Sequence, residues 1–228
     1  MSTVEDFQSQ VAAKVQDDSG KISATERDQF IQEAVTAYSQ DRPLIKVADL
    51  AGDGGYDCDV PSDFLAGFSV IRSVEYPAGQ RSPAIIERGS YRLYRTVSAT
   101  TLRLLENTPQ SGETVRVTYT ALHVVDDEGS TVPGHDEDAV VSLAASFYCR
   151  ALAAYYAQTG DPTLGADVVN YRTKAQEYSA LSDRLERLYR THIGRQEGET
   201  ASAMSRTMDW DTELSWGKDY LFHRKKWR

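Results

Sequence analysis

Residues 23–50, SATERDQFIQEAVTAYSQDRPLIKVADL, change from one hydrophobic period to another within a few positions. Before Pro43 the apolar residues recur at helical spacing, and Ser23 with Glu26 has the pattern of a capping box that starts the helix. After Pro43 the period becomes two, and β-branched residues become frequent, as in a strand. The stretch therefore predicts a helix that ends at Arg42 and leads into a β region, which places the chain in the α+β class.

The residues before this stretch predict another helix. A capping-box pattern begins at Thr3, and one apolar residue follows every four positions, at Phe7, Val11 and Val15. We expect residues 1–43 to form an N-terminal helical hairpin.

Residues 44–125 have the pattern of an antiparallel β insertion. We expect strands at residues 44–50, 56–60, 68–76, 91–96, 100–106 and 114–121. The connections are short, which favours antiparallel pairing, and the last strand alternates Val115, Val117 and Tyr119 with polar residues. This alternation predicts a sheet with one buried face and one solvated face.

Residues 126–194 predict a C-terminal pair of helices. The segment 139–157, AVVSLAASFYCRALAAYYA, contains a single charge, Arg150, and is close to the length of a membrane-spanning helix. Its apolar content is mostly alanine, and a central arginine costs about 2.5 to 3.5 kcal/mol on membrane insertion. We therefore interpret it as a helix buried in protein, with Asp136 as its N-terminal cap.

The fourth helix is expected at about residues 167–192, with a charged face opposite an apolar stripe. The stripe would contain Tyr171, Ala175, Tyr178, Leu181, Leu185, Leu188 and His192. Gly194 follows as a helix stop. These two helices and the N-terminal hairpin predict a protein that is mostly a bundle of four main helices.

Residues 195–228 predict an extended C-terminal arm. The arm contains all three tryptophans of the chain and ends in a basic cluster, although the whole chain has a net charge of −9. Tryptophan and arginine dominate the energetics of protein interfaces, so this composition is typical of a docking segment. The candidate docking residues are Trp210, Trp216, Tyr220, Leu221, Phe222, Arg224, Lys225, Lys226 and Trp227.

No motif in the sequence predicts catalysis, a cofactor or a metal. The four histidines lack ligand spacing, and Asp53, Asp57 and Asp59 lie around the glycines of a turn without the ligand order of a calcium loop. Cys58 and Cys149 lie in no nucleophile motif and provide no disulfide framework. We therefore expect a protein that is not an enzyme.

One segment leaves an alternative open. Residues 88–95, RGSYRLYR, interleave arginine with tyrosine, and Tyr91, Arg92 and Tyr94 could form a platform for single-stranded nucleic acid. The other interpretation is a strand whose side chains alternate between faces, with the arginines in solvent. We favour the strand, and keep a nucleic-acid-binding module as the alternative function.

The order of these elements resembles that of a known family. The segments that carry the resemblance are 34–43 (AVTAYSQDRP), 56–64 (YDCDVPSDF), 71–77 (IRSVEYP), 112–123 (GETVRVTYTALH), the acidic start of the alanine-rich helix, and 171–175 (YRTKA). Together they are similar to the head-to-tail adaptor, or connector, proteins of tailed bacteriophages, over about residues 5–190.

The resemblance implies a structural protein of the virion neck, assembled in the host cytoplasm. Such adaptors form a ring, commonly dodecameric, under the portal, which joins the capsid to the tail and continues the DNA channel. The implied partners are further copies of the chain, the portal protein, and a stopper or tail protein. DNA would only pass through the channel, and no membrane is involved. The C-terminal arm would be the extension that grips the portal.

Overall fold

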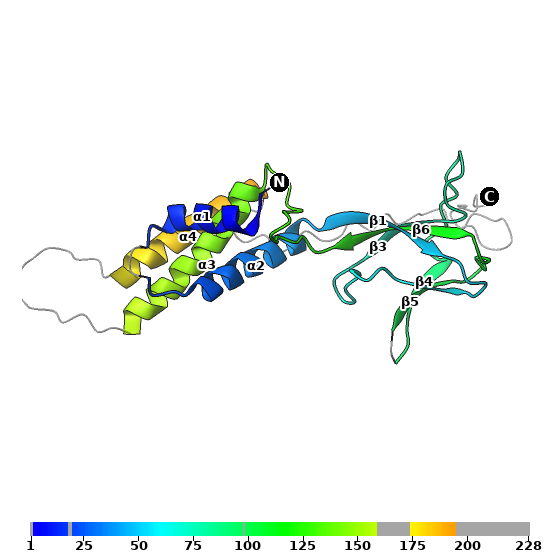
Figure 1. The fold of residues 1–228 in the computed structure, drawn as a ribbon, viewed down its shortest axis with the longest axis horizontal. Coiled ribbons are helices and arrows are strands. Elements are labelled where there is room, and N and C mark those ends of the chain that lie inside the picture. Colours follow the sequence, from blue (N-terminus) through cyan, green and yellow to red (C-terminus); the bar gives the residue numbers. More distant parts are fainter. Residues whose placement is uncertain (1, 18–19, 98, 159–173, 195–228) are drawn as a thin grey trace, which may run out of the picture. The chain divides into compact units, whose positions relative to one another are not determined.

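The computed structural model describes residues 2–17, 20–97, 99–158 and 174–194. These ranges contain four helices and six strands, which confirms the α+β class (Figure 1). The helices are α1 (Val4–Val15), α2 (Ala24–Asp41), α3 (Glu137–Gln158) and α4 (Lys174–His192). The strands are β1 (Leu44–Ala51), β2 (Asp57–Asp59), β3 (Ile71–Glu75), β4 (Tyr91–Arg95), β5 (Thr100–Leu104) and β6 (Thr114–Ala121).

Both predicted capping boxes are present. In α1 the Asp6 carboxylate accepts a hydrogen bond from the Thr3 backbone N–H at 2.8 Å, and the Thr3 hydroxyl accepts one from the Asp6 backbone N–H. Ser23 and Glu26 form the same reciprocal pair at the start of α2. These bonds satisfy backbone donors that have no partner within the helix, so each helix begins where its sequence predicts.

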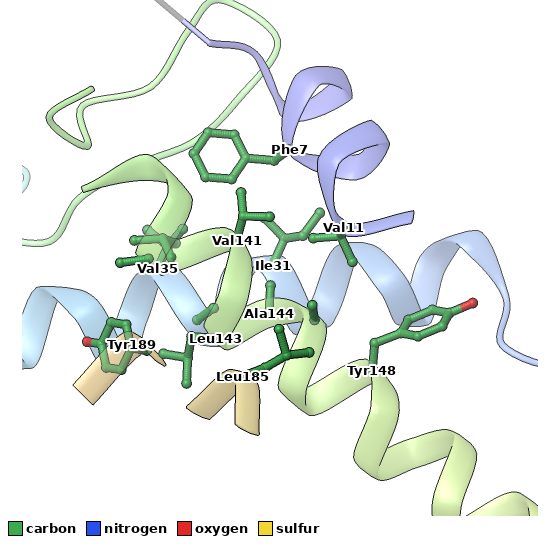
Figure 2. Close-up of a cluster of buried hydrophobic side chains, with 14 of the residues drawn as sticks. Phe7, Val11, Ile31, Val35, Val141, Leu143, Ala144, Tyr148, Leu185 and Tyr189 are labelled. Atoms are coloured by element: carbon green, nitrogen blue, oxygen red, sulfur yellow. The ribbon is translucent and has the colours of Figure 1, made fainter. Parts of the chain in front are cut away.

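The four helices bury their apolar faces in one cluster, part of which is shown in Figure 2. Helix α3 contacts α1, α2 and α4 and contributes eleven buried residues. By length and composition alone α3 could cross a membrane, but 61% of its most apolar window is buried inside the protein. Its apolar side chains are therefore accounted for by contacts with the other helices.

The six strands form two three-stranded antiparallel sheets, in the orders β1-β6-β3 and β2-β5-β4. One apolar cluster includes buried residues from both sheets. The predicted alternation of β6 is confirmed, because Val115, Val117 and Tyr119 are buried whereas Thr114, Arg116 and Thr118 are only partly buried. Leu44 at the start of β1 is paired with Ala121 at the end of β6, so the β region leaves the helices and returns to them at one ladder.

The prediction for α4 was partly wrong. Leu185 and Tyr189 are buried, but Leu188, which we expected on the buried stripe, is 52% exposed. The buried face is centred on Ser182, whose hydroxyl donates to the Ser146 backbone oxygen of α3 at 2.9 Å. Leu188 lies on the solvent side of α4, whereas Tyr189 is buried and its hydroxyl donates to Asp41 of α2 at 2.7 Å. The expected stripe residue Tyr171 lies outside the described residues.

Candidate assembly site

A buried carboxylate lies where the helices and strands of the chain join. Asp136 immediately precedes α3, and its side chain is only 2% exposed. It accepts hydrogen bonds from the Tyr38 hydroxyl at 2.5 Å, from Arg42 Nη1 at 2.9 Å to each oxygen, and from His192 Nε2 at 2.7 Å. The carboxylate thus connects the start of α3 with the end of α2 and the end of α4.

These donors keep Asp136 ionised. Burial alone would raise the pKa of its carboxyl, but hydrogen bonds from Tyr38, His192 and Arg42 outweigh burial and lower the pKa to about 2. The same contacts raise the pKa of the Arg42 guanidinium. The ionised carboxylate therefore bonds the ends of α2 and α4 to the start of α3. With so low a pKa, Asp136 is a poor proton acceptor for catalysis.

A second set of bonds lies beside the carboxylate. His123 follows β6, and its backbone N–H donates to the Ser39 hydroxyl of α2 at 2.9 Å. The His123 ring places Nε2 at 3.0 Å from the Arg42 backbone oxygen and Nδ1 at 2.9 Å from that of Thr131. The last turn of α2 is therefore bonded to the segment that returns from the β region.

The sequence prediction for Asp136 missed this role. We expected it to cap α3, whereas its carboxylate bonds to Tyr38, Arg42 and His192. No spacing signal could have found these partners, because they lie 98, 94 and 56 residues away. A carboxylate that is buried needs hydrogen-bond donors or positive charges in place of water, so partners of this kind are expected wherever an acidic residue is buried.

The described part of the chain gathers no other chemical site. No group of three or more His, Cys, Asp or Glu side chains there could hold a metal ion, and Asp57 is bound by Arg103. Burial raises the pKa of the Cys149 thiol to about 12, so this thiol is neutral near pH 7. A polar hollow of about 390 Å³ on α4 is lined by Asp183, Glu186, Arg187 and Arg190.

The Tyr/Arg strand does not form a stacking platform on one face. Tyr91 is buried in the apolar core of the β region, whereas Tyr94 lies on the opposite face of β4. The Arg103 guanidinium covers the Tyr94 ring at 3.7 Å from its centroid and is itself bonded to Asp57 at 2.6 and 2.7 Å. These contacts favour the strand interpretation, with Arg92 in solvent.

The predicted portal-docking residues lie outside the described residues, so their role stays a prediction. They are Trp210, Trp216, Tyr220, Leu221, Phe222, Arg224, Lys225, Lys226 and Trp227.

The helical part of the fold is thus a long apolar helix that contacts three others, and Asp136 bonds its start to α2 and α4. The sequence matches the SU10 adaptor protein family over residues 2–208, and the chain belongs to this family. The match confirms the resemblance to head-to-tail adaptors.

Solved structures include similar chains from gene transfer agent (GTA) particles. One, from the virion of the native GTA particle, is 17% identical with a TM-score of 0.29, covering 80% of this chain and 87% of that chain. Another, from the neck of the native particle computed with C12 symmetry, is 17% identical with a TM-score of 0.28, covering 81% and 92%. A third, from the neck of the empty particle computed with C6 symmetry, is 16% identical with a TM-score of 0.29, covering 80% and 87%. These TM-scores are low, and the assignment rests on the family match. No curated protein sequence matches the chain.

Proposed function

We propose that this protein is the head-to-tail adaptor of a bacteriophage virion. In this role it forms a ring under the portal, with twelve subunits as is common in such adaptors. The ring joins the capsid to the tail and continues the DNA channel. The observation that carries the proposal is the match to the adaptor family over residues 2–208. The ring would be assembled in the host cytoplasm and remain in the neck of the virion.

The charge of the chain supports a passive channel. Each copy has a net charge of −9, so a ring of copies is strongly acidic. An acidic wall repels DNA phosphates over about one Debye length, roughly 8 Å at physiological salt, which lets the genome slide without binding. This property also disfavours the alternative function, a nucleic-acid-binding module.

The proposed organisation has four parts. Residues 1–43 and 126–194 form the helical bundle, residues 44–125 the β insertion, and residues 195–228 the arm that docks on the portal. The stopper or tail protein binds the opposite end of the ring. Within the arm, Trp210, Trp216, Phe222 and Trp227 are the proposed anchors, since buried aromatic residues provide most of the binding energy at interfaces.

Removal of residues 195–228 tests the portal contact. The truncated protein should keep its melting transition within about 2 °C, because the core clusters that the described residues form are built from residues before 195. It should lose binding to the portal protein in a pull-down and by calorimetry. Unchanged portal affinity of the truncated chain would show that the docking surface lies elsewhere.

A point-substitution series makes the test sharper. Replacing Trp210, Trp216, Phe222 and Trp227 by alanine should weaken portal binding at least about a hundredfold, since single anchors of this kind contribute about 2 kcal/mol or more. Replacing Ser202, Thr207, Thr212 and Ser215 by alanine is the matched control, and it should leave the affinity within about threefold. Electron micrographs of the wild-type protein mixed with portal should show rings.

A further inference from the structure

The sheet β2-β5-β4 carries opposite charges on its two outer strands. The segment 88–105, which contains β4 and β5, has four arginines and no other charged residue, and the segment 53–63, which contains β2, has four aspartates and no basic residue. Strands β2 and β4 flank β5 on either side. The basic strand β4 and the acidic strand β2 therefore lie at opposite edges of one sheet.

Only part of this charge is neutralised within one copy. Arg103 of β5 binds Asp57, and Asp63 pairs with Lys46. Among the described residues, Arg88, Arg92 and Arg95 form no ion pair, and neither do Asp53 and Asp59. All five of these side chains are exposed. Each edge thus presents unpaired charge of one sign to solvent.

The β4–β5 hairpin also exposes apolar side chains. Leu93 is 44% exposed, Tyr94 43%, and Val97, near the hairpin tip, is fully exposed. The closed end of the hairpin projects away from β1, β3 and β6 (Figure 1), and among the described residues no strand pairs with the outer edge of β4. An unpaired edge with exposed apolar side chains is typical of a surface that binds another protein.

The acidic edge has an apolar residue of its own. Tyr56 lies between Asp53 and Asp57 and is 60% exposed. An aromatic ring among carboxylates can pack against apolar side chains while the carboxylates pair with arginines. The two edges are therefore complementary in both charge and hydrophobicity.

We propose that the β4–β5 hairpin of one copy docks on the Asp53–Asp59 segment of the next copy. Arg92 and Arg95 pair with Asp53 and Asp59 of the neighbour, and the hairpin's apolar side chains pack near the neighbour's Tyr56. Because the two surfaces differ and both are present on every chain, the association is head-to-tail, and it closes into a ring when the rotation between copies allows. This inference rests on the proposed function and specifies which surfaces assemble the ring.

A second copy of this chain fits the hairpin better than a nucleic acid does. The two tyrosines of β4 lie on opposite faces, and the ring of Tyr94 is covered by Arg103. The rest of the chain is acidic enough to repel phosphates, since the whole chain has a net charge of −9 even with these arginines included. Another copy presents the exposed carboxylates of Asp53 and Asp59, with which these arginines can pair locally.

Charge reversal tests the interface in the full-length protein. Arg92→Glu with Arg95→Glu, and separately Asp53→Lys with Asp59→Lys, should each raise the concentration for half-maximal self-association at least about tenfold in sedimentation velocity at low salt. The chain that carries all four substitutions should associate within about threefold of wild type, because the pairs are restored with the signs exchanged. Arg72→Glu with Arg81→Glu is the matched control, since both arginines are exposed and the change in charge is the same.

Each other outcome overturns the proposal. It is wrong if the wild-type chain remains monomeric at every concentration, if either reversal pair associates like wild type, or if the fourfold variant is not restored while its melting temperature is unchanged. Binding of a labelled single-stranded DNA 20-mer that is lost in Arg92→Glu with Arg95→Glu, without any change in self-association, would assign the hairpin to nucleic acid instead. Portal binding separates the two hypotheses: if rings and portal binding persist in the reversal variants, the adaptor function stands and only this interface fails.

Discussion

Asp136 shows how one residue can hold several chain segments in place. Burying a carboxylate is unfavourable by several kcal/mol unless donors replace the lost water. Here Tyr38, Arg42 and His192 supply those donors. Arg42 remains 41% exposed, so water can solvate its charge if the carboxylate is removed, which limits the loss on substitution.

Asp136→Asn should therefore destabilise the fold by about 2 to 3 kcal/mol, which is roughly 5 to 10 °C in melting temperature for a chain of this size. The substitution removes the charge that binds Arg42 and turns an acceptor oxygen into a donor. Asp138→Asn is the control two residues further on, because Asp138 is 81% exposed and only pairs with Lys14, so its loss should cost less than about 1 kcal/mol. Equal losses in calorimetry would contradict the assigned role of the buried carboxylate.

The same residue predicts a dependence of stability on acid. The pKa of Asp136 is lowered from 3.8 to about 2 in the folded protein, so between these pH values the unfolded chain binds more protons than the folded one. The stabilisation from Asp136 is present above about pH 4 and is lost as pH falls through about 2, a change of roughly 2 kcal/mol. In urea titrations, the difference in the free energy of unfolding between wild type and Asp136→Asn should decrease from pH 5 to pH 2.5. If this difference were the same at both pH values, the lowered pKa of Asp136 would not contribute to stability.

Residue roles of this kind could not be predicted from sequence. Asp136 has the pattern of a helix cap, and its partners come from segments separated by as many as 98 residues. The contacts at His123 are similar, because its ring bonds to a backbone oxygen 81 residues earlier. Only the tertiary fold brings such groups together, so local pattern carries no information about them.

Single elements, in contrast, were predicted well because their signals are local. Thr3 with Asp6 and Ser23 with Glu26 lie within one helical turn, and both pairs form the expected capping boxes. The alternation of apolar residues in β6 is also a local signal, and it correctly predicts which face of the strand is buried.

The cap of α2 gives a measurable prediction. Ser23→Ala should lower the free energy of unfolding by about 1 kcal/mol, because it removes the oxygen that accepts from the Glu26 backbone N–H at 3.2 Å. Ser9→Ala in α1 is the control, since the Ser9 hydroxyl is exposed and donates only to a backbone oxygen of its own helix, so the change should stay within about 0.5 kcal/mol. If the two variants unfold at the same urea concentration, the cap contributes nothing.

Helix α4 shows where an element-level prediction fails. Leu185, Leu188 and Tyr189 all fit an apolar stripe at three- and four-residue spacing, so periodicity cannot decide which side the core contacts. The side of α4 that faces the core is the side of Ser182, whose hydroxyl donates to the backbone oxygen of Ser146 in α3. Tyr189 is also fixed by the bond from its hydroxyl to Asp41 at 2.7 Å.

Alanine substitution on α4 should separate the two leucines. Leu185→Ala should cost about 2 to 4 kcal/mol, because the side chain is 6% exposed and its removal leaves a cavity in the helical core. Leu188→Ala should change stability by less than about 1 kcal/mol, because Leu188 is largely in solvent and alanine favours helix. A larger loss at Leu188 than at Leu185 in thermal unfolding would reverse the orientation assigned to α4.

For the whole molecule, the sequence predicted the class of fold but not the pairing of strands. Six short strands can be arranged in many ways, and nothing in their patterns shows that β1 pairs with β6 or that β2 and β4 flank β5. These pairings join residues up to 77 positions apart, as in Leu44 with Ala121, and are set by the common core of the two sheets.

The whole chain should be indifferent to metal chelators. The described residues hold no group of metal-ligating side chains, and a structural metal normally supplies much of the folding energy around its site. Excess EDTA should leave the melting temperature of the full-length protein unchanged within about 1 °C. A decrease of several degrees that added Zn²⁺ or Ca²⁺ reverses would show that the chain contains a metal site.

The pairing of Leu44 with Ala121 has a consequence for how this chain can vary. Both ends of the β region lie on one rung of a ladder, about 5 Å apart, which is close to the reach of a tight turn. The backbone can therefore be joined at this rung, or β regions of different length can be grafted there, without moving α2 or α3. Residues 45–120 can therefore be replaced by another β region, in evolution or by design, while the four helices are kept.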